Sequence, residues 1–268
     1  MRNKNYTAII LEGESRERTI VENLMTNCLQ KDNYKIIAFP AGVNIYMLWL
    51  ELKKDMFETD VIEVVKEMSS TARDILLDIE RNDISEIILF FDYDAHQSNL
   101  PDDVDPQDVL KKMLKTFDNE TELGKLYISY PMVEALRDHI PNRCVAFTNS
   151  DCVYNLQEFH QYKEKSGIDN PMINIKNYKF THWKEIINIF ALRVSCLFDR
   201  TDVMNFEEYR ELVSPCTIYN RQQTYIQADS IFILSAFPEY LLDYFGLGFW
   251  NTCVKRRHLI IEDHCRRR

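Results

Sequence analysis

The sequence predicts an α/β fold, in which a largely parallel sheet is flanked by helices and followed by a mainly helical C-terminal region. Three observations lead to this prediction. In the first half, short apolar runs of strand length alternate with amphipathic segments of helical period. The strongest run, residues 84–91 (ISEIILFF), is too apolar for an exposed edge and is expected at the centre of the sheet. Beyond about residue 150, strand signals are weak and helical patterns dominate.

Four strands are expected in the first half. They cover residues 6–11, 34–39, 84–91 and 125–129. The first ends at Glu12-Gly13 and the second at Pro40-Ala41-Gly42, both of which are turn signals. Strands that alternate with helices are typical of an open, mostly parallel sheet.

Helices are expected between these strands. One follows Ser15, one covers residues 44–57, and one opens at Asp60, where Glu63 three residues later suggests a capping box. Apolar positions at helical spacing extend this last helix to about Arg81. Further helices are expected after Asp105-Pro106, after Tyr130-Pro131, and over 183–198, 204–213 and 238–245. The predicted domains are residues 1–150, with a helical insertion at about 43–82, and residues 151–268.

The composition is that of a globular protein. Hydrophobic residues make up 46% of the 268 residues and charged residues 28%. No apolar stretch approaches the roughly 18–20 residues of a membrane helix, and the N-terminus lacks a signal-peptide core, so we expect no membrane partner and a cytoplasmic location. Seven cysteines without C-x-x-C spacing indicate neither a disulfide framework nor a zinc site.

The charge is unevenly distributed along the chain. A net charge of −10 argues against a protein that coats nucleic acid by charge alone. Residues 249–268, however, hold six basic residues against two acidic ones. Within this tail, Lys255, Arg256 and Arg257 are candidate phosphate contacts, and a merely solvated terminus is an equally good interpretation.

Three acids are expected at one edge of the sheet. Glu12 follows the first strand, and Asp92 and Asp94 follow the strand over 84–91. Ligands of open α/β sheets sit beyond the carboxyl ends of the strands. The alternation of an extended chain points Asp92 and Asp94 to the same side. Clustered carboxylates repel one another, and Mg²⁺, which prefers oxygen ligands and keeps several waters, would remove that cost.

Each candidate also has an ordinary structural interpretation. Glu12 alone would suit the start of the following helix, and either aspartate alone would suit a loop cap. Glu134, on the first turn of an expected helix, is a fourth candidate ligand or a residue that complements the helix dipole. His96 is either a proton shuttle beside the metal or a solvated loop residue.

The motifs around these acids resemble the TOPRIM domain of topoisomerases, bacterial primases and small nucleases. The matching segments are LEGES (11–15) and IILFFDYD (87–94), within about residues 6–140. YPMVE (130–134) is similar to an element of phage-defence TOPRIM proteins, such as the OLD-family nucleases and the nuclease subunit of the PARIS system. The resemblance implies a TOPRIM-like sheet and a metal-dependent endonuclease, a hydrolase that cleaves phosphodiester bonds of DNA or RNA, tRNA included.

The resemblance also implies roles for the site residues. Glu12 would be the general base or a metal ligand, Asp92 and Asp94 would be metal ligands, and Glu134 would bind a second ion. One or two ions, Mg²⁺ or alternatively Mn²⁺, would serve hydrolysis, with two ions roughly 3.5–4 Å apart. The enzyme would be a toxic effector of anti-phage (antiviral) defence. The chain contains no G-x-x-x-x-G-K-[ST] motif, so a restraining ATPase or sensor would be a separate protein.

Two other functions compete with the nuclease. A strand that ends in D-x-D also describes haloacid-dehalogenase-type phosphatases, in which Asp92 would be the nucleophile and Asp94 the acid. That interpretation leaves Glu12 without a task. A non-catalytic adaptor with a TOPRIM-like fold is the third hypothesis. Its partner or homodimer surface would use the aromatic residues of the C-terminal region, for which core packing is the commoner role: Phe232, Phe237, Tyr240, Tyr244, Phe245, Phe249 and Trp250.

Overall fold

The computed structural model describes residues 5–29, 35–93, 99–139, 152–168 and 170–255. The chain divides into two compact units, Met1–Tyr127 and Ile128–Arg268. The boundary therefore lies between Tyr127 and Ile128, whereas the sequence analysis placed it near residue 150. Within the described residues, no helix has the length and apolar character needed to cross a bilayer.

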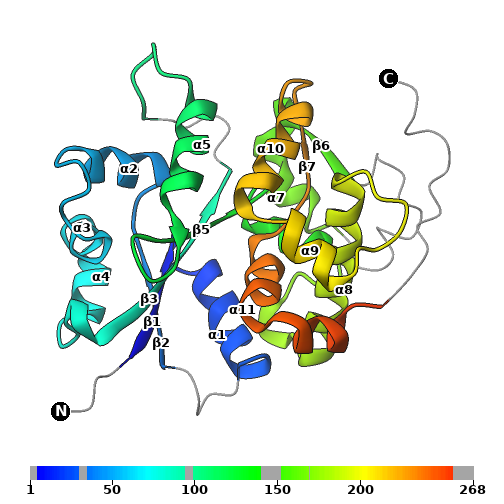
Figure 1. Cartoon of the computed structure of the whole chain (residues 1–268), viewed down its shortest axis with the longest axis horizontal. Helices are drawn as coiled ribbons and strands as arrows, with labels where there is room; N and C mark the ends of the chain where they lie inside the picture. The colour runs from blue at the N-terminus through cyan, green and yellow to red at the C-terminus, as the bar shows by residue number, and fades with distance from the viewer. Residues whose placement is uncertain (1–4, 30–34, 94–98, 140–151, 169, 256–268) are drawn as a thin grey trace. The chain divides into compact units, whose positions relative to one another are not determined.

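A five-stranded sheet organises the first unit (Figure 1). Its order is β2-β1-β3-β5-β4, and β1 pairs in parallel with β2 on one side and β3 on the other. The short β4 pairs antiparallel with β5. The strands are β1 (Tyr6–Leu11), β2 (Lys35–Pro40), β3 (Ile84–Asp92), β4 (Asp118–Asn119) and β5 (Gly124–Ser129). All four predicted strands are present, and the predicted α/β class is confirmed.

Burial follows the order of the strands. In β1, Ala8 to Leu11 are at most 1% exposed, and the apolar run Ile87–Phe91 of β3 is also buried. In β2, which lies at the edge of the described sheet, Lys35 is exposed and the next three residues are only partly buried. The near-continuous apolar character of β1 and β3 thus reflects burial on both faces.

Helices connect the strands of the first unit. They are α1 (Arg16–Asn27), α2 (Ile45–Lys53), α3 (Val61–Met68), α4 (Ser70–Ile75), the 3-10 turn η1 (Arg81–Asp83) and α5 (Pro106–Thr116). The predicted cap of α5 is confirmed, because Asp105 accepts a hydrogen bond from the Gln107 backbone N–H and Pro106 occupies the first helical position.

The prediction of one continuous helix from Asp60 to Arg81 is wrong. Asp60 does cap α3 by accepting from the Ile62 N–H, but α3 ends at Met68. Ser69 is extended (φ −124°, ψ 115°), and its hydroxyl caps the next helix by accepting from the Ala72 N–H at 3.2 Å. Apolar periodicity continues across the break because both helices bury the same kind of face, so the period alone does not reveal a cap inside the run.

The helix predicted over residues 44–57 is shorter in the structure. It ends at Lys53, and the chain then turns through Met56 (φ +60°) and Phe57 (φ +65°). Positive φ angles are unfavourable for residues with a Cβ and cannot continue a right-handed helix. The Phe57 ring packs against Trp49, with ring centroids 5.0 Å apart, and this tertiary contact holds the turn.

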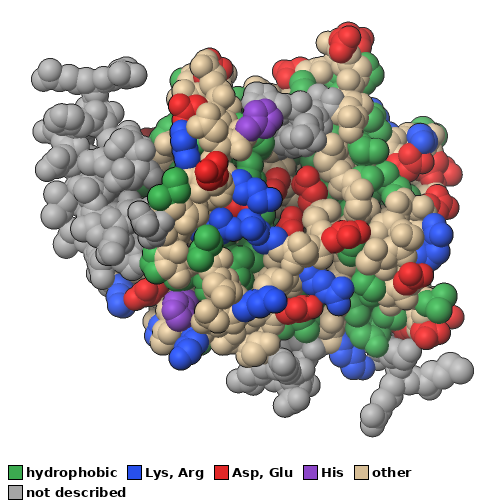
Figure 2. Space-filling model, turned by 180° about the vertical axis from the view of Figure 1, so that it is seen from behind, with side chains coloured by type: hydrophobic (Ala, Val, Ile, Leu, Met, Phe, Trp, Pro, Cys, Tyr) green, Lys and Arg blue, Asp and Glu red, His purple; other side chains and the backbone are tan. Residues whose placement is uncertain are grey.

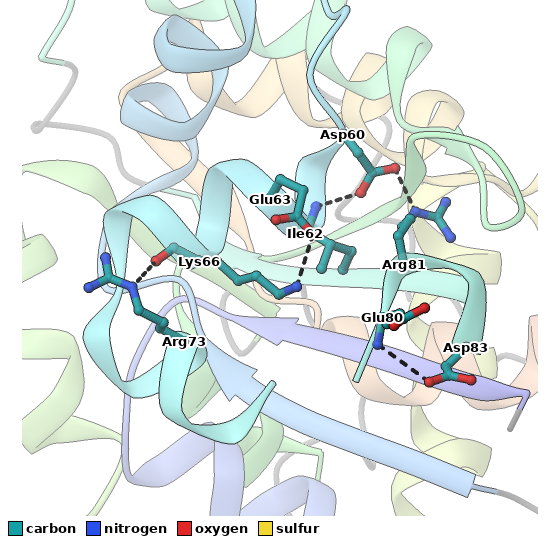
Figure 3. A network of polar contacts seen from close by, with 8 residues as sticks. All are labelled: Asp60, Ile62, Glu63, Lys66, Arg73, Glu80, Arg81 and Asp83. Carbon is teal, nitrogen blue, oxygen red and sulfur yellow. Dashed lines mark hydrogen bonds and ion pairs between the residues drawn. The ribbon is translucent and has the colours of Figure 1, made fainter. Parts of the chain in front are cut away.

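A polar network ties the helical insertion to the start of β3 (Figure 3). The Arg81 Nε lies 2.6 Å from the Asp60 carboxylate, and another guanidinium nitrogen donates to the Ile84 carbonyl. Arg73 donates to the carbonyls of Lys66 and Glu67 at the end of α3. Glu63, which the sequence predicted to complete a capping box with Asp60, instead pairs with Lys66 at 2.9 Å. The two Arg73 bonds satisfy carbonyls at the C-terminal end of α3, which the break at Ser69 creates.

The second unit is mainly helical, as predicted. A two-stranded antiparallel hairpin, β6 (Val153–Asn155) with β7 (Ser230–Phe232), accompanies the helices. The helical segments are η2 (Val133–Asp138), η4 (Leu156–Gln161), α7 (Tyr162–Lys165), η5 (Ile175–Asn177), α8 (Phe180–Leu197), α9 (Phe206–Leu212), α10 (Pro215–Ile226) and α11 (Ala236–Cys253). The predicted helices over 183–198, 204–213 and 238–245 correspond to α8, α9 and the first part of α11.

Two features of these helices bear on the predictions. Gly246, expected just past the end of a helix, has φ +62° and interrupts α11. The sequence analysis missed α10, although Ser214-Pro215 carries the same kind of start signal as Asp105-Pro106: Ser214 accepts from the Thr217 N–H and Pro215 is the first helical residue.

The second unit buries an arginine. Arg193 on α8 is fully buried, and its guanidinium donates to the backbone carbonyls of Ile233 at 3.0 Å and Asp138 at 2.9 Å. The Asp138 carboxylate accepts a hydrogen bond from the Tyr162 hydroxyl. Of the aromatic residues that the adaptor hypothesis would use as a partner surface, Phe232, Phe237, Tyr240 and Trp250 are buried and pack as core. Tyr244, Phe245 and Phe249 are half-buried.

Candidate metal centre

The strand order creates a switch point between β1 and β3. From β1 the chain first crosses to β2 on one side and later returns to β3 on the other side. Connections above the carboxyl ends of these neighbouring strands therefore diverge, and such crevices are where open α/β sheets bind ligands. Leu11, the last residue of β1, pairs with Phe90 of β3, so Glu12 and Asp92 leave the same edge of the sheet, one and two residues beyond that pair.

A hydrogen bond joins the two acidic residues at this point. The Glu12 carboxylate accepts a hydrogen bond from the Asp92 backbone N–H, with an Oε2–N distance of 3.0 Å. The Glu12 backbone N–H also donates to the Phe90 carbonyl at 3.2 Å. Both side chains are half-buried. Glu12 is thus held toward the end of β3 by its backbone and its side chain.

At the end of β3, Tyr93 packs inward, and the predicted alternation with Asp94 stays a prediction. Tyr93 is only 5% exposed, whereas the preceding Asp92 is half-buried. Burial, with a smaller contribution from the Asp105 carboxylate, raises the pKa of Tyr93 to about 12. Tyr93 therefore stays protonated and belongs to the packing of the strand. Asp94 and His96 lie outside the described residues.

The described donors fit a magnesium-type ion better than a zinc-type ion. Glu12 and Asp92 offer carboxylate oxygens, and Mg²⁺ is usually bound by one or two carboxylates with waters and substrate phosphates in its other positions. Structural and catalytic zinc sites need three or four protein ligands. In the part of the chain that the structure describes, no three His, Cys, Asp or Glu side chains gather closely enough for such a site.

Glu134 lies in the second unit, near the start of the 3-10 helix η2. The helix predicted after Tyr130-Pro131 is therefore present, but it has the tighter 3-10 form and six residues. The Glu134 side chain is 3% exposed, and its Oε1 lies 3.9 Å from the Lys163 Nζ. Its predicted role as a metal ligand stays a prediction.

The basic tail begins at the end of α11. Lys255 is exposed, and its backbone N–H donates to the Asn188 side chain at 2.7 Å. Arg256 and Arg257 lie outside the described residues. On the face drawn in Figure 2, Lys and Arg side chains lie among Asp and Glu side chains.

The sequence analysis missed Glu17 as a residue of the site. Its carboxylate accepts a hydrogen bond from the Gly13 backbone N–H at 3.2 Å, directly after Glu12. An acid in the first turn of a helix is the signal that was present, but the same signal is expected wherever an acid complements the helix dipole. Only the folded turn shows that Glu17 accepts from the Gly13 N–H in addition to complementing the helix dipole.

No protein-family model, curated protein or solved structure matches the chain. The fold and the site therefore define its class by themselves. The chain is an α/β protein with a mostly parallel sheet, in which the Glu12 carboxylate, directly after β1, accepts from the Asp92 backbone N–H of β3 at the switch point.

Proposed function

We propose that the chain is a metal-dependent nuclease that hydrolyses phosphodiester bonds at the Glu12–Asp92 site. The observation that carries this proposal is the contact between the Glu12 carboxylate and the Asp92 backbone at the switch point between β1 and β3. It brings one acid from each of two neighbouring buried strands to the position where such sheets bind phosphate-containing ligands.

In this proposal Glu12 and Asp92, together with Asp94, hold Mg²⁺ or Mn²⁺. A carboxylate offers about four lone-pair positions, so the bond from the Asp92 N–H leaves Glu12 able to contact a cation or accept a proton from water. A bound ion supplies Lewis-acid stabilisation of the phosphate and lowers the pKa of a coordinated water. The half-burial of both acids strengthens their attraction for a cation relative to acids in bulk water.

The nuclease is tested most sharply by Glu12→Gln. Glutamine keeps an oxygen that can accept from the Asp92 N–H but removes the charge, whereas alanine removes both. We expect Mg²⁺- or Mn²⁺-dependent cleavage of DNA or RNA to fall by about 10²-fold or more in Glu12→Gln and in Asp92→Asn, the scale observed when one group that stabilises transition-state charge is lost. Glu14→Gln, at an exposed acid two residues away, is the matched control and should cleave like wild type.

The same variants separate the nuclease from its competitors. A phosphatase that uses Asp92 as nucleophile would hydrolyse small phosphate esters, lose that activity in Asp92→Asn, and keep it in Glu12→Gln, where the bond to the Asp92 N–H survives. An adaptor would bind neither Mg²⁺ nor Mn²⁺ in calorimetry. Cleavage that persists undiminished in Glu12→Gln would contradict the proposed site.

The resemblance to phage-defence nucleases extends the proposal to a toxic effector restrained by a separate ATPase or sensor. Nucleic acid would be the substrate, with Lys255, Arg256 and Arg257 as phosphate contacts. Induced expression of the wild type without a restraining partner should reduce the viability of the host cell, and Glu12→Gln should not. Equal toxicity of both proteins would dissociate the harm from the proposed chemistry.

A further inference from the structure

The turn between β1 and α1 is held in an unusual way. Ser15, the N-cap of α1, has an αR backbone conformation and makes no side-chain capping bond. The first turn instead contributes Glu17, whose carboxylate reaches back four residues to accept from the Gly13 N–H. Glu17 is only 8% exposed, which is low for a carboxylate.

The Glu17 carboxylate lies over Gly13 at very short range. A Cβ added to Gly13 would come within 2.7 Å of Oε2 and 2.9 Å of Oε1 of Glu17. No real Cβ approaches oxygen atoms so closely, so glycine is needed at position 13 wherever Glu17 keeps this position. The requirement is set by Glu17, because Gly13 does not have a positive φ.

The bond to Gly13 also acts on Glu12. The Gly13 nitrogen and the Glu12 carbonyl belong to one planar peptide group, which begins at the Glu12 Cα. Fixing the Gly13 N–H therefore fixes the orientation of the backbone that leaves Glu12. On its other side, Glu12 is fixed by its N–H bond to Phe90, and its carboxylate accepts from Asp92.

We propose that Glu17 is a positioning residue for Glu12, and this inference rests on the proposed nuclease function. Glu17 holds the Glu12–Gly13 peptide so that the Glu12 carboxylate stays aimed at the end of β3. It does not contact the metal ion itself. Among the described residues, Glu12, Asp92 and Glu17 are not grouped closely enough to form a shared metal site.

Three single variants and one double variant test the proposal. Glu17→Gln keeps an oxygen that accepts from the Gly13 N–H, so it should retain cleavage within about threefold of wild type. Glu17→Ala removes the bond, and Gly13→Ala pushes the flexible carboxylate away without altering it. Glu17→Ala and Gly13→Ala should each lower kcat by roughly 10²-fold, the effect of a displacement of about 1 Å in a catalytic group.

The double variant, Gly13→Ala with Glu17→Ala, should be no slower than either single variant. Both changes break the same contact, and effects on one contact are not additive. Glu22→Ala is the matched control, because Glu22 lies on the exposed face of the same helix, where it pairs with Arg18. It should cleave like wild type.

If Glu17→Gln were as inactive as Glu17→Ala, the positioning role would be overturned, because the charge of Glu17 rather than its hydrogen bond would then matter. Rate losses that multiply in the double variant would also overturn it. Amide hydrogen exchange at Gly13 gives a readout that needs no activity: exchange should be slow in wild type and Glu17→Gln and fast in Glu17→Ala. A wild type that cleaves no nucleic acid but shows this exchange pattern would refute the nuclease while supporting the contact. Fast exchange in an active wild type would refute the contact alone.

Discussion

At the scale of single residues, Glu12 combines a structural and a proposed chemical task. Its side chain supports the last amide of β3 and also supplies the charge that a metal ion would need. A net hydrogen bond contributes about 0.5–1.5 kcal/mol to stability, and more when the acceptor is charged. Loss of activity in Glu12→Ala therefore does not separate the two tasks. Glutamine does so, because it changes the charge and keeps the acceptor.

His139 leads to a prediction about pH. The side chain is fully buried, its Nδ1 donates to the Ala135 carbonyl at 2.7 Å, and its ring stacks on Phe190. Burial, and secondarily the neighbouring Arg193 guanidinium, hold the pKa of His139 well below 6.5, against a smaller opposite effect of the Ala135 carbonyl. The folded state therefore binds fewer protons at this site than the unfolded state.

The contribution of neutral His139 to the free energy of unfolding is fully present above the unfolded pKa of about 6.5. It is lost as the pH falls below that value, by at most about 1.4 kcal/mol per pH unit. We expect urea unfolding between pH 7.5 and 5 to show this loss in wild type and a smaller loss in His139→Leu. His160→Gln, at an exposed histidine, is the control and should follow wild type. An unchanged pH dependence in His139→Leu would show that His139 is not kept neutral in the fold.

Residues with a structural or proposed chemical role differ in how far the sequence predicts that role. Glu12 and Asp92 each end a strand with a strong local pattern, so their common edge follows from periodicity and topology. Glu17 and Arg193 have roles that depend on contacts made only after folding. Arg193 reaches the carbonyls of residues 40 and 55 positions away, and no local pattern predicts such partners.

At the scale of elements, Gly124 determines how β5 begins. Its φ is +108°, and an added Cβ would lie 2.5 Å from the Leu89 side chain and 2.9 Å from that of Ile87, both on β3. Gly124→Ala combines backbone strain with overpacking, each of which typically costs about 1–3 kcal/mol. We expect a loss of at least about 2 kcal/mol in the free energy of unfolding, measured by urea denaturation.

Gly248 on α11 provides the matched control. A Cβ there would meet nothing within 4 Å, and Gly248 is helical. Replacing a helical glycine by alanine stabilises by roughly 0.5–1 kcal/mol. Gly248→Ala should therefore be neutral or stabilising. If Gly124→Ala were as stable as Gly248→Ala, the close packing of β5 on β3 would be contradicted.

Predictability also varies among elements. The strands β1 and β3 and the helix α5 are predicted because their apolar runs and caps are local signals. The break between α3 and α4 at Ser69 lies within an unbroken helical period, and the Arg73 side chain that satisfies the end of α3 carries no distinctive pattern. β6 and β7 have three residues each, too few for a period to be recognised.

At the scale of the whole molecule, metal binding should be visible as stability even before a substrate is known. A ligand that binds only the folded state stabilises it by about 2.7 kcal/mol at a concentration 100 times its Kd. We expect Mg²⁺ or Mn²⁺ to raise the Tm of the wild type by several degrees, at roughly 2–4 °C per kcal/mol, and EDTA to reverse the increase.

The metal effect should disappear in Glu12→Gln and Asp92→Asn and persist in Glu14→Gln. A Tm increase of the same size in Glu12→Gln and Asp92→Asn would place the ion elsewhere on this acidic chain, whose net charge is −10.

The fold class and the helical character of the second half could be read from the sequence, but the division of the chain could not. The two units meet between Tyr127 and Ile128, inside the single strand β5. No change in composition, proline-rich stretch or glycine-rich stretch marks that position. A boundary inside a strand depends on which tertiary contacts the residues before and after it make. The local sequence pattern does not indicate those contacts.

The edge strand β2 bears on whether the protein aggregates, both during folding and once folded. An edge strand presents unpaired amide and carbonyl groups to any passing chain, and its apolar residues 36–39 are a potential nucleus for aggregation. Two residues that oppose such pairing stand at the ends of β2. Its first residue is Lys35, whose Nζ lies 5.9 Å from the centroid of the Tyr6 ring, and its last is Pro40, which has no N–H to donate. Charge at one end and proline at the other thus discourage intermolecular pairing along the strand next to the one that carries Glu12.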